Sequence, residues 1–424
     1  MQKTMSKDLG EIIASFIPEG YKINKKTGES HPQKLTPSKL TELLSDACQV
    51  DIKLTYCQLT KQCKLNNFLD LKSDDFDFFF VKLAKRGWMI SKGDAKACLM
   101  NGCLENQYHP VKNYLTTGIM KIQPVDIDRL ATNYLGTNSA LYDEMLKKTL
   151  IGAVSRIFKP ACKMDYLCVL KGDQGIKKST FWRVLCEGEH FNSGWFCDTP
   201  QENRKDLMLT IHTCWIYEFQ ELDATTTQKD QGSVKNLITG TSDKFRAPYA
   251  ATVDDHARAS ILVGTVNSDD FLRDFTGARR FWVIDLPDKQ IDIQRLKKDR
   301  DKIWKAAFLE YEKGVLPYLQ PHFEEEAAKA NENYAPEDPF LQKTEVWLNA
   351  DAQWMQPFTT MDALFGSGIF QDNKDIKPNT FHLKMMAKTL RTLGFKQKCT
   401  TLPNGHKQRQ WFKVSLLTRS DEIG

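Results

Sequence analysis

The chain has 424 residues, of which 41% are hydrophobic and 27% are charged. This length exceeds what one ordinary hydrophobic core holds, so two or three domains are expected, and the apolar fraction excludes an intrinsically disordered protein. The formal net charge of +5 permits nucleic-acid binding but does not identify a partner, because many enzymes share this balance.

The N-terminal part of the chain is expected to be helical. Residues 1–36 are polar and rich in lysine with few periodic apolar positions, which indicates a loose polar arm. Thr36 followed by Pro37 is typical of a helix cap with a first-turn proline. Further helical patterns follow, up to a stretch over 124–158. We therefore predict a helical N-terminal domain over residues 37–158.

The residue pattern of the next segment is typical of an α/β domain. Short apolar runs, too short for helices, alternate with helical or loop segments, and one run is followed directly by a helical stretch over 179–186. Such runs are typical of buried core strands. The expected strands cover residues 166–170, 213–217, 260–266 and 281–286. Residues 159–290 are therefore predicted to form an α/β core.

The residue pattern of the C-terminal part indicates two different segments. Residues 291–337 are charged and helical, which predicts a connector or lid. Beyond them, helical stretches precede two strand-like runs that flank Asn404-Gly405, and Asn-Gly between alternating runs is the strongest short hairpin signal. Helices followed by a basic hairpin predict a winged-helix-like domain over residues 338–424.

A phosphate-binding loop is predicted between the first core strand and the following helix. It comprises Gly172, Asp173, Gln174, Gly175, Ile176, Lys177, Lys178, Ser179 and Thr180. Glycines let backbone amides approach phosphate oxygens, a lysine meets the β/γ-phosphates, and a hydroxyl holds Mg²⁺. Lys177 stands where this pattern has glycine, so an ordinary strand–turn–helix with two solvated lysines is the alternative.

Polar residues that suit nucleotide hydrolysis follow the other strands. Glu218 and Glu221 end the second strand, where carboxylates would hold Mg²⁺ and polarise water. Asn267 follows the third strand beside Thr265, and could orient water near a γ-phosphate. The pair Arg279-Arg280 would suit an arginine finger. Ordinary strand ends and solvated arginines are the alternatives.

Basic and aromatic residues that could contact DNA occur in two places. Lys244, Arg246 and Tyr249 interleave on one loop, where the alternative is a packed loop with a rigid proline. Lys407 and Arg409 lie on the terminal hairpin, where a solvated surface is the alternative.

The order of these segments resembles the virulence-associated E proteins, which are P-loop proteins of phages and mobile elements related to superfamily 3 helicases. The resemblance covers about residues 105–285 and rests on five stretches. They are His109-Pro110-Val111 with Tyr114-Leu115; Gly172-x-Gln174-Gly175-x-x-Lys178-Ser179-Thr180-Phe181; Glu218-x-x-Glu221-Leu222; Asp243-x-x-Arg246-x-Pro248-Tyr249; and Gly264-Thr265-x-Asn267 through Phe271-Leu272-x-Asp274-x-Thr276-Gly277-x-Arg279-Arg280-Phe281-Trp282.

The resemblance implies an AAA+/superfamily 3-like ATPase core that uses ATP and Mg²⁺, assembles as a ring with a hexamer favoured, and acts on DNA. By position, Lys178 would bind phosphates, Ser179 and Glu218 would hold Mg²⁺, and Asn267 would be the sensor. Glu221 would share the carboxylate role, and Arg279 or Arg280 would reach a neighbouring subunit. Lys177 departs from the family pattern.

The sequence thus predicts a helicase-like replication motor of a phage or mobile element, with replication proteins of the host or phage as further partners. A DNA-bound ATPase switch or loader that does not unwind, and a protein with a degenerate loop, are the alternatives. The cysteines are scattered singly and the first 20 residues hold several charges, so we expect reduced thiols in a cytoplasmic protein. No apolar run approaches the roughly 18 residues that span a bilayer, so no membrane partner is expected.

Overall fold

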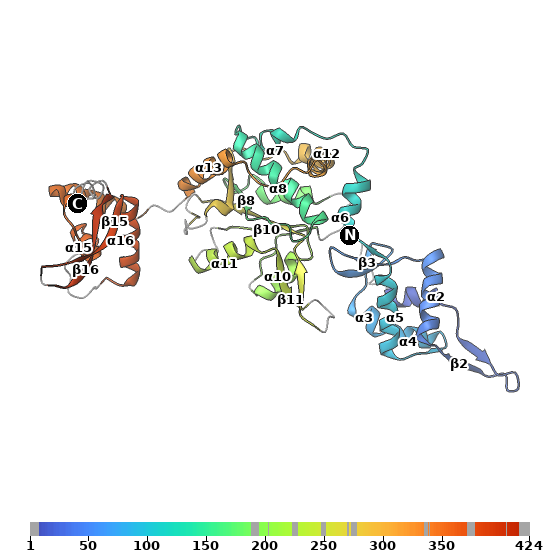
Figure 1. Cartoon of the computed structure of the whole chain (residues 1–424). Helices are drawn as coiled ribbons and strands as arrows, with labels where there is room; N and C mark the ends of the chain where they lie inside the picture. The colour runs from blue at the N-terminus through green and yellow to red at the C-terminus, as the bar shows by residue number, and fades with distance from the viewer. Residues whose placement is uncertain are drawn as a thin grey trace. The chain divides into compact units, whose positions relative to one another are not determined.

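The structure, a computed structural model, divides into two compact units that are each described by themselves, residues 1–335 and 336–424 (Figure 1). It describes residues 8–187, 195–201, 203–222, 228–246, 252–268, 271–272, 278–334, 338, 340–370, 378–403 and 405–414. The predicted α/β class is confirmed by a parallel sheet covered by helices.

The beginning of the first unit is mixed rather than helical. Its helices are α1 (Leu9–Ser15), α2 (Pro37–Val50), α3 (Ser73–Asp77), α4 (Phe79–Lys85) and α5 (Lys92–Leu104). Its strands are β1 (Tyr21–Ile23), β2 (Ser30–Lys34), β3 (Leu54–Cys57), β4 (Gln62–Leu65), β5 (Leu69–Asp70), β6 (Trp88–Met89) and β7 (Gln107–Tyr108), which form two small sheets. These strands have two to five residues, too few to show a clear alternation of apolar and polar positions.

Two predictions for this region need correction. Residues 1–36 are not a loose arm where the structure describes them, because α1 buries Ile13 and the following turn buries Ile17 in the same hydrophobic cluster as α2. The predicted cap is present, since the Thr36 hydroxyl accepts the backbone N–H of Lys39. The helical domain expected over 37–158 contains the whole sheet of β3, β4, β5 and β7 and strand β6 of the other sheet, and it does not end at a domain boundary.

The helices after Tyr108 pack on the main sheet. They are α6 (Pro110–Asn113), a π-helical turn (Tyr114–Gly118), a 3₁₀ turn (Ile127–Arg129), α7 (Leu130–Leu135) and α8 (Ala140–Phe158). Most of α8 is buried, in one cluster with residues of the first core strand. These helices therefore belong to the α/β core, although the sequence pattern grouped them with the N-terminal domain.

The main sheet has five parallel strands in the order β14-β8-β13-β10-β9. They are β8 (Leu167–Lys171), β9 (Phe196–Cys197), β10 (Ile216–Phe219), β13 (Ile261–Val266) and β14 (Phe281–Asp285). The four predicted strands are all present, and only the two-residue β9 was missed. Because the strands are parallel, their carboxyl ends meet at one edge of the sheet.

Helices and one hairpin connect these strands. They are α9 (Lys178–Leu185), α10 (Arg204–Ile211), α11 (Gln228–Thr239) and the antiparallel pair β11 (Ser242–Phe245) and β12 (Asp254–Ala257), followed by a 3₁₀ turn (Ala278–Arg280) before β14. The hairpin was not predicted, because its strands carry mostly polar residues.

The charged segment after β14 is part of the same core. It forms α12 (Ile293–Glu312), α13 (Pro321–Ala330) and a 3₁₀ turn (Asn331–Tyr334). On α12, Trp304 stacks on Trp215 with ring centroids 4.1 Å apart and donates its indole N–H to the Leu185 carbonyl at 2.7 Å. A separate connector or lid over 291–337 is therefore the wrong description, because α12 packs on α8 and α9, and α13 packs on α8 and β14.

The second unit has its own small core. It contains α14 (Leu341–Asn349), a 3₁₀ turn (Ala350–Met355), α15 (Thr360–Gly366), α16 (Thr380–Thr392), β15 (Phe395–Thr401) and β16 (Lys407–Lys413). The last two strands form the predicted hairpin, and Trp411 lies buried with Phe358 and Leu390. Of the predicted turn, Asn404 lies outside the described residues.

Candidate functional site

The segment between β8 and α9 is an irregular loop at the carboxyl edge of the sheet. Gly172 follows β8 with φ 151° and donates its backbone N–H to the Val266 carbonyl at 3.3 Å. A side chain at Gly172 would be strained at this φ, and its Cβ would lie 2.6 Å from Ile176 Cδ1, which would have to shift. Gly175 also has a positive φ, of 91°. The loop then enters α9, whose first N–H groups have no partner within the helix.

The two adjacent lysines of this loop differ in burial and in the contacts of their side chains. Lys178 is 7% exposed, and its ammonium donates to the carbonyls of Gly172 at 2.5 Å and Asp173 at 2.8 Å and to Asn267 Oδ1 at 2.8 Å. Lys177 is exposed and caps α9 in the left-handed conformation with φ 74°. Lys178 therefore faces the interior of the loop, and Lys177 occupies the backbone position that usually requires glycine.

We expect Lys177→Gly to raise the free energy of unfolding by up to about 1 kcal/mol, because a left-handed residue with a Cβ costs roughly that much. ATP affinity should be kept or rise modestly. Lys297→Gly is the matched control, since Lys297 is exposed in the interior of α12, where glycine should destabilise. Thermal unfolding and isothermal titration measure both effects. A clear loss of ATP affinity in Lys177→Gly would contradict the expectation from the sequence that Lys178, and not Lys177, binds the phosphates.

A buried carboxylate joins the first turn of α9 to the neighbouring strands. Glu218, at the end of β10, accepts the Ser179 hydroxyl at 2.6 Å and the Thr265 hydroxyl at 2.8 Å, both on Oε1. Its side chain is almost completely buried, and Oε2 has no hydrogen-bond partner among the described residues. The structure thus brings together five of the residues singled out from the sequence, namely Lys178, Ser179, Glu218, Thr265 and Asn267.

The electrostatics of Glu218 fit a divalent cation. Burial raises the pKa of Glu218 above its usual value, although the hydrogen bonds from Ser179 and Thr265 oppose this. A buried carboxylate with one bare oxygen beside a hydroxyl offers the hard oxygen ligands that Mg²⁺ prefers. No group of three or more His, Cys, Asp or Glu side chains forms a metal site in the described part of the chain. The Ser179 hydroxyl and the Glu218 carboxylate therefore fit a divalent cation with oxygen ligands.

Sequence reasoning missed a second acidic residue at this edge. Asp198 directly follows β9, pairs with Arg183 of α9, and accepts the Gln220 amide at 2.9 Å. The negative charge of Asp198 is one of the causes that raise the Glu218 pKa. The two-residue strand before Asp198 gave no sequence signal, whereas Arg183 could have been found one helical turn after Ser179.

Three of the predicted catalytic residues do not join this cluster within one chain. Glu221 is exposed with φ 47°, and no described contact links it to Ser179 or Lys178. Arg279 and Arg280 precede β14, whose Phe281 pairs with Leu167 and whose Asp285 pairs with Lys171. These arginines therefore lie at the amino edge of the sheet. A five-residue strand separates them from the loop edge, which is about 16 Å.

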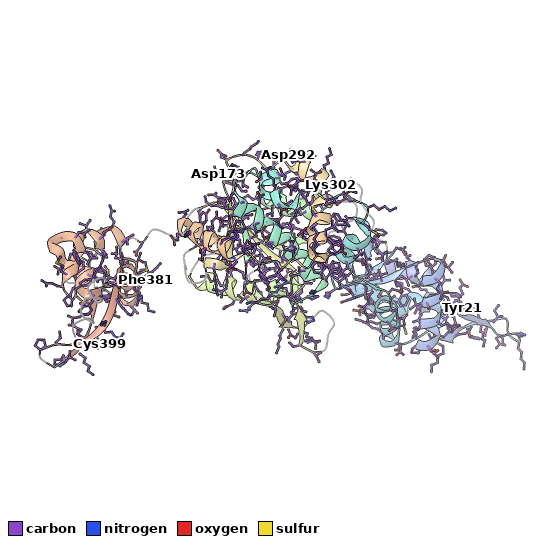
Figure 2. The ribbon with its side chains drawn as sticks, turned by 45° about the horizontal axis from the view of Figure 1, so that its top comes forward. Tyr21, Asp173, Asp292, Lys302, Phe381 and Cys399 are labelled. Atoms are coloured by element: carbon purple, nitrogen blue, oxygen red, sulfur yellow. The ribbon has the colours of Figure 1, made fainter. Side chains whose placement is uncertain are left out.

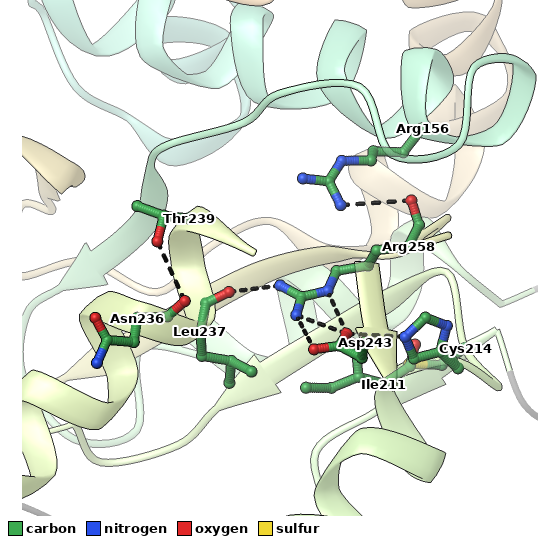
Figure 3. A network of polar contacts seen from close by, with 9 residues as sticks. Arg156, Ile211, Cys214, Asn236, Leu237, Thr239, Asp243 and Arg258 are labelled. Carbon is green, nitrogen blue, oxygen red and sulfur yellow. Dashed lines mark hydrogen bonds and ion pairs between the residues drawn. The ribbon is translucent and has the colours of Figure 1, made fainter. Parts of the chain in front are cut away.

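The β11–β12 hairpin carries the first predicted DNA-binding group. Lys244 and Arg246 are exposed on this hairpin, whereas Tyr249 lies outside the described residues. A buried polar network anchors its base (Figure 3). Arg258, only 1% exposed, donates to Asp243 Oδ1 at 2.8 Å and Oδ2 at 2.7 Å, and also to the Leu237 carbonyl.

The second predicted DNA-binding group lies in the other unit. Lys407 and Arg409 are exposed on β16, and β15 adds exposed Lys396 and Lys398. Thr401 pairs with Lys407 and Cys399 with Arg409 across the hairpin, so like charges are not directly opposed at these positions. By this register Lys407 and Arg409 lie on one face of the hairpin, and Lys396 and Lys398 lie on the other.

Comparison with known proteins places this arrangement in a family. The model of the virulence-associated protein E-like domain matches residues 120–336, about half of the chain. The chain belongs to the virulence-associated protein E-like family. The family resemblance predicted from the sequence is thereby confirmed. The virulence-associated protein E-like domain includes the five-stranded sheet, the loop with Lys178, and both helices α12 and α13.

The chain is also similar to solved apo structures of the NrS-1 C-terminal region. One has a TM-score of 0.48 and 12% identity and covers 89% of this chain and 99% of that chain. Another has a TM-score of 0.46 and 14% identity and covers 90% and 100%. No curated protein sequence matches the chain. In the part that the structure describes, the helices are all too short or too polar to traverse a bilayer.

Proposed function

We propose that the chain is an ATP-hydrolysing, DNA-acting motor of a phage or mobile element that uses Mg²⁺. The observation that carries this proposal is the meeting of Lys178, Ser179 and Glu218 at the carboxyl edge of a parallel sheet, with Asn267 on the adjacent strand. A loop with this lysine and hydroxyl at a helix N-terminus suits the triphosphate of a nucleotide. Membership in the virulence-associated protein E-like family supports the same reading.

In this proposal each side chain has a defined role. Lys178 exchanges its contacts with the Gly172 and Asp173 carbonyls for the β/γ-phosphate oxygens. Ser179 and Glu218 would hold Mg²⁺, which would neutralise charge that develops on the transferred phosphoryl group. Glu218 Oε2, which has no described protein partner, orients the attacking water. Asn267, already bonded to Lys178, lies where it can sense the γ-phosphate.

The positions of the arginines support an oligomer. Arg279 and Arg280 lie at the sheet edge opposite to Lys178, so neither arginine serves the loop of its own chain. In a ring, favoured as a hexamer, this edge of one chain would meet the nucleotide of the next, and one arginine would act as a finger in trans.

DNA is the proposed partner of two surfaces. The exposed Lys244 and Arg246 project from the hairpin that precedes strand β13, and Asn267 directly follows this strand. A movement of Asn267 on nucleotide hydrolysis would therefore be transmitted along β13 to the hairpin. The second unit, with α14, α15, α16 and a basic hairpin among its described residues, would act as a winged-helix-like module whose Lys407 and Arg409 contact phosphates.

We expect ATP hydrolysis to be stimulated by single-stranded DNA. The measurement is steady-state hydrolysis with and without the oligonucleotide, for the full chain and for a chain ending at residue 335. This truncation removes only the second unit, so basal hydrolysis should persist while the salt dependence of DNA binding becomes shallower. Turnover that DNA does not change would favour a switch or loader over a motor. If the chain neither hydrolyses nor binds ATP, the proposal is wrong and the loop is a degenerate one that does not bind nucleotide.

A further inference from the structure

A hollow lies against the phosphate loop on the side away from Glu218. It has a volume of about 450 Å³ and is lined by Lys177 and Thr180 of the loop and by the segment 290–294. This size falls in the range of about 300–1,000 Å³ that is typical of small-molecule sites. Asp173 of the loop and Asp292 at the rim of the hollow lie at the same end of the first unit (Figure 2).

The sheet order explains why the hollow lies there. Strand β8 leads into the loop and has β13 on one side and β14 on the other. The β13 side carries Asn267 and, one strand further, Glu218. The β14 side continues directly into the segment that lines the hollow. A ligand whose phosphates lie on the loop with its γ end toward Glu218 must therefore extend its other end toward β14.

Hydrogen bonds fix the segment after β14 to the loop. The Leu286 N–H donates to the Lys171 carbonyl at 2.9 Å, and the Ile291 N–H donates to the Ile176 carbonyl at 3.2 Å. Ile291 is buried, whereas Gln290, Asp292 and Gln294 are exposed. The hollow therefore combines an apolar floor with a polar rim, held in fixed register with the phosphate loop.

Charge indicates which part of a ligand fits. The hollow lies where α9 and α12 both begin, and two helix N-termini would attract an anion. At α12, however, Asp292 is the N-cap, and its carboxylate accepts the Arg295 N–H at 3.0 Å. This carboxylate disfavours a second phosphate at the hollow. Neutral rings with hydrogen-bonding edges suit an apolar floor rimmed by glutamine amides.

We propose that this hollow receives the ribose and base of the nucleoside triphosphate, with Ile291 as floor and Gln290 and Gln294 at the rim. The assignment rests on the proposed function, because the phosphates must occupy the adjacent loop. Thr180, between the two regions, is the residue nearest the junction of phosphate and sugar. The segment 290–294 is thus a binding element, although the sequence predicted only a connector there.

The test separates the nucleoside from the phosphates by using two probes, ATP and inorganic tripolyphosphate. Isothermal titration is carried out on the wild-type chain and on Gln290→Trp, which fills the hollow from an exposed position. Wild type should bind ATP at least ten times more tightly than tripolyphosphate. Gln290→Trp should lose at least tenfold in ATP affinity and keep tripolyphosphate affinity within about twofold. Gln294→Trp blocks the hollow from α12 and should give the same result if Gln290→Trp does not fold.

Asp288→Trp is the matched control, because Asp288 is exposed on the same segment but does not line the hollow. It should change neither affinity. Equal binding of both probes by wild type, unchanged ATP affinity in both blocked variants, or an equal loss of both probes would overturn the nucleoside assignment and leave the phosphate loop standing. A wild-type chain that binds neither probe would overturn the proposed function together with this inference.

Discussion

Lys178→Ala is expected to reduce ATP hydrolysis by about 100-fold or more, the scale on which removal of one well-placed electrostatic group acts. The reason lies in the geometry of the loop. The Lys178 ammonium is held between the carbonyls of Gly172 and Asp173 and the amide oxygen of Asn267. It therefore already lies at the centre of the loop, where triphosphate oxygens would replace the carbonyls.

Lys205→Ala provides the control for this experiment. It removes the same charge from an exposed residue of α10 that lines neither the loop nor the hollow. Lys205→Ala should retain hydrolysis within a few fold, so a general loss of positive charge would be distinguished from loss of the phosphate-binding side chain. Thermal unfolding of both variants reports whether the fold is kept. Wild-type turnover in Lys178→Ala would refute the ATPase assignment.

A second pair of variants separates binding from hydrolysis. Glu218→Gln keeps the size of the side chain and a hydrogen-bond acceptor for Ser179 and Thr265, but it removes the negative charge that would orient Mg²⁺ and water. It should bind nucleotide and hydrolyse it slowly. This split between affinity and turnover would not follow from simple misfolding.

The core of the site could be predicted from the sequence because buried parallel strands have a recognisable residue pattern. Strands buried on both faces, such as β8 and β13, appear as continuous apolar runs. Their carboxyl ends share one edge, so polar residues that directly follow them converge. From this rule alone, Glu218 and Asn267 are expected to lie near Lys178 and Ser179, and the hydrogen bonds of the structure agree.

Other elements could not be predicted, for identifiable physical reasons. β9 has two residues and gives no periodicity, so Asp198 at its end was missed. The β11–β12 hairpin carries polar residues on exposed strands, and so its pattern looked like a loop. α12 was interpreted as a connector because of its many charges, yet Trp304 and five other apolar residues bury it against α8 and α9. Composition alone does not reveal such a buried set of residues.

Asp243→Ala should destabilise the first unit by about 3–5 kcal/mol, because removing one partner of a buried ion pair leaves the other charge uncompensated. Arg258 is almost completely buried and donates to both carboxylate oxygens of Asp243. His212 also bonds Asp243 at 2.9 Å. Asp255→Ala on the same hairpin is the control, since Asp255 is exposed, and should change stability by less than about 0.5 kcal/mol. Urea unfolding of each variant measures the difference.

The double variant Asp243→Ala/Arg258→Met distinguishes a buried unpaired charge from lost packing. If the unpaired guanidinium is the cause, replacing it with an apolar side chain should recover part of the stability that Asp243→Ala loses. If the double variant is less stable than the single one, packing around Arg258 dominates and the explanation fails.

The pH dependence of unfolding gives an independent test of the same network. Burial opposes ionisation of Asp243, but the bonds from His212 and Arg258 outweigh it and hold the Asp243 pKa below its usual value. The contribution of ionised Asp243 to the free energy of unfolding is therefore complete above the ordinary aspartate pKa, about 3.9. This contribution disappears as the pH falls through the lowered pKa of Asp243 in the folded chain. Burial lowers the pKa of His212. As the pH falls below about 6.5, the unfolded chain therefore takes up this proton first, and stability begins to decline. The wild-type chain should thus lose stability in two acid steps, and Asp243→Ala should lack the lower one. A profile in which both chains lose stability in parallel down to pH 3 would show that Asp243 is not held ionised by Arg258.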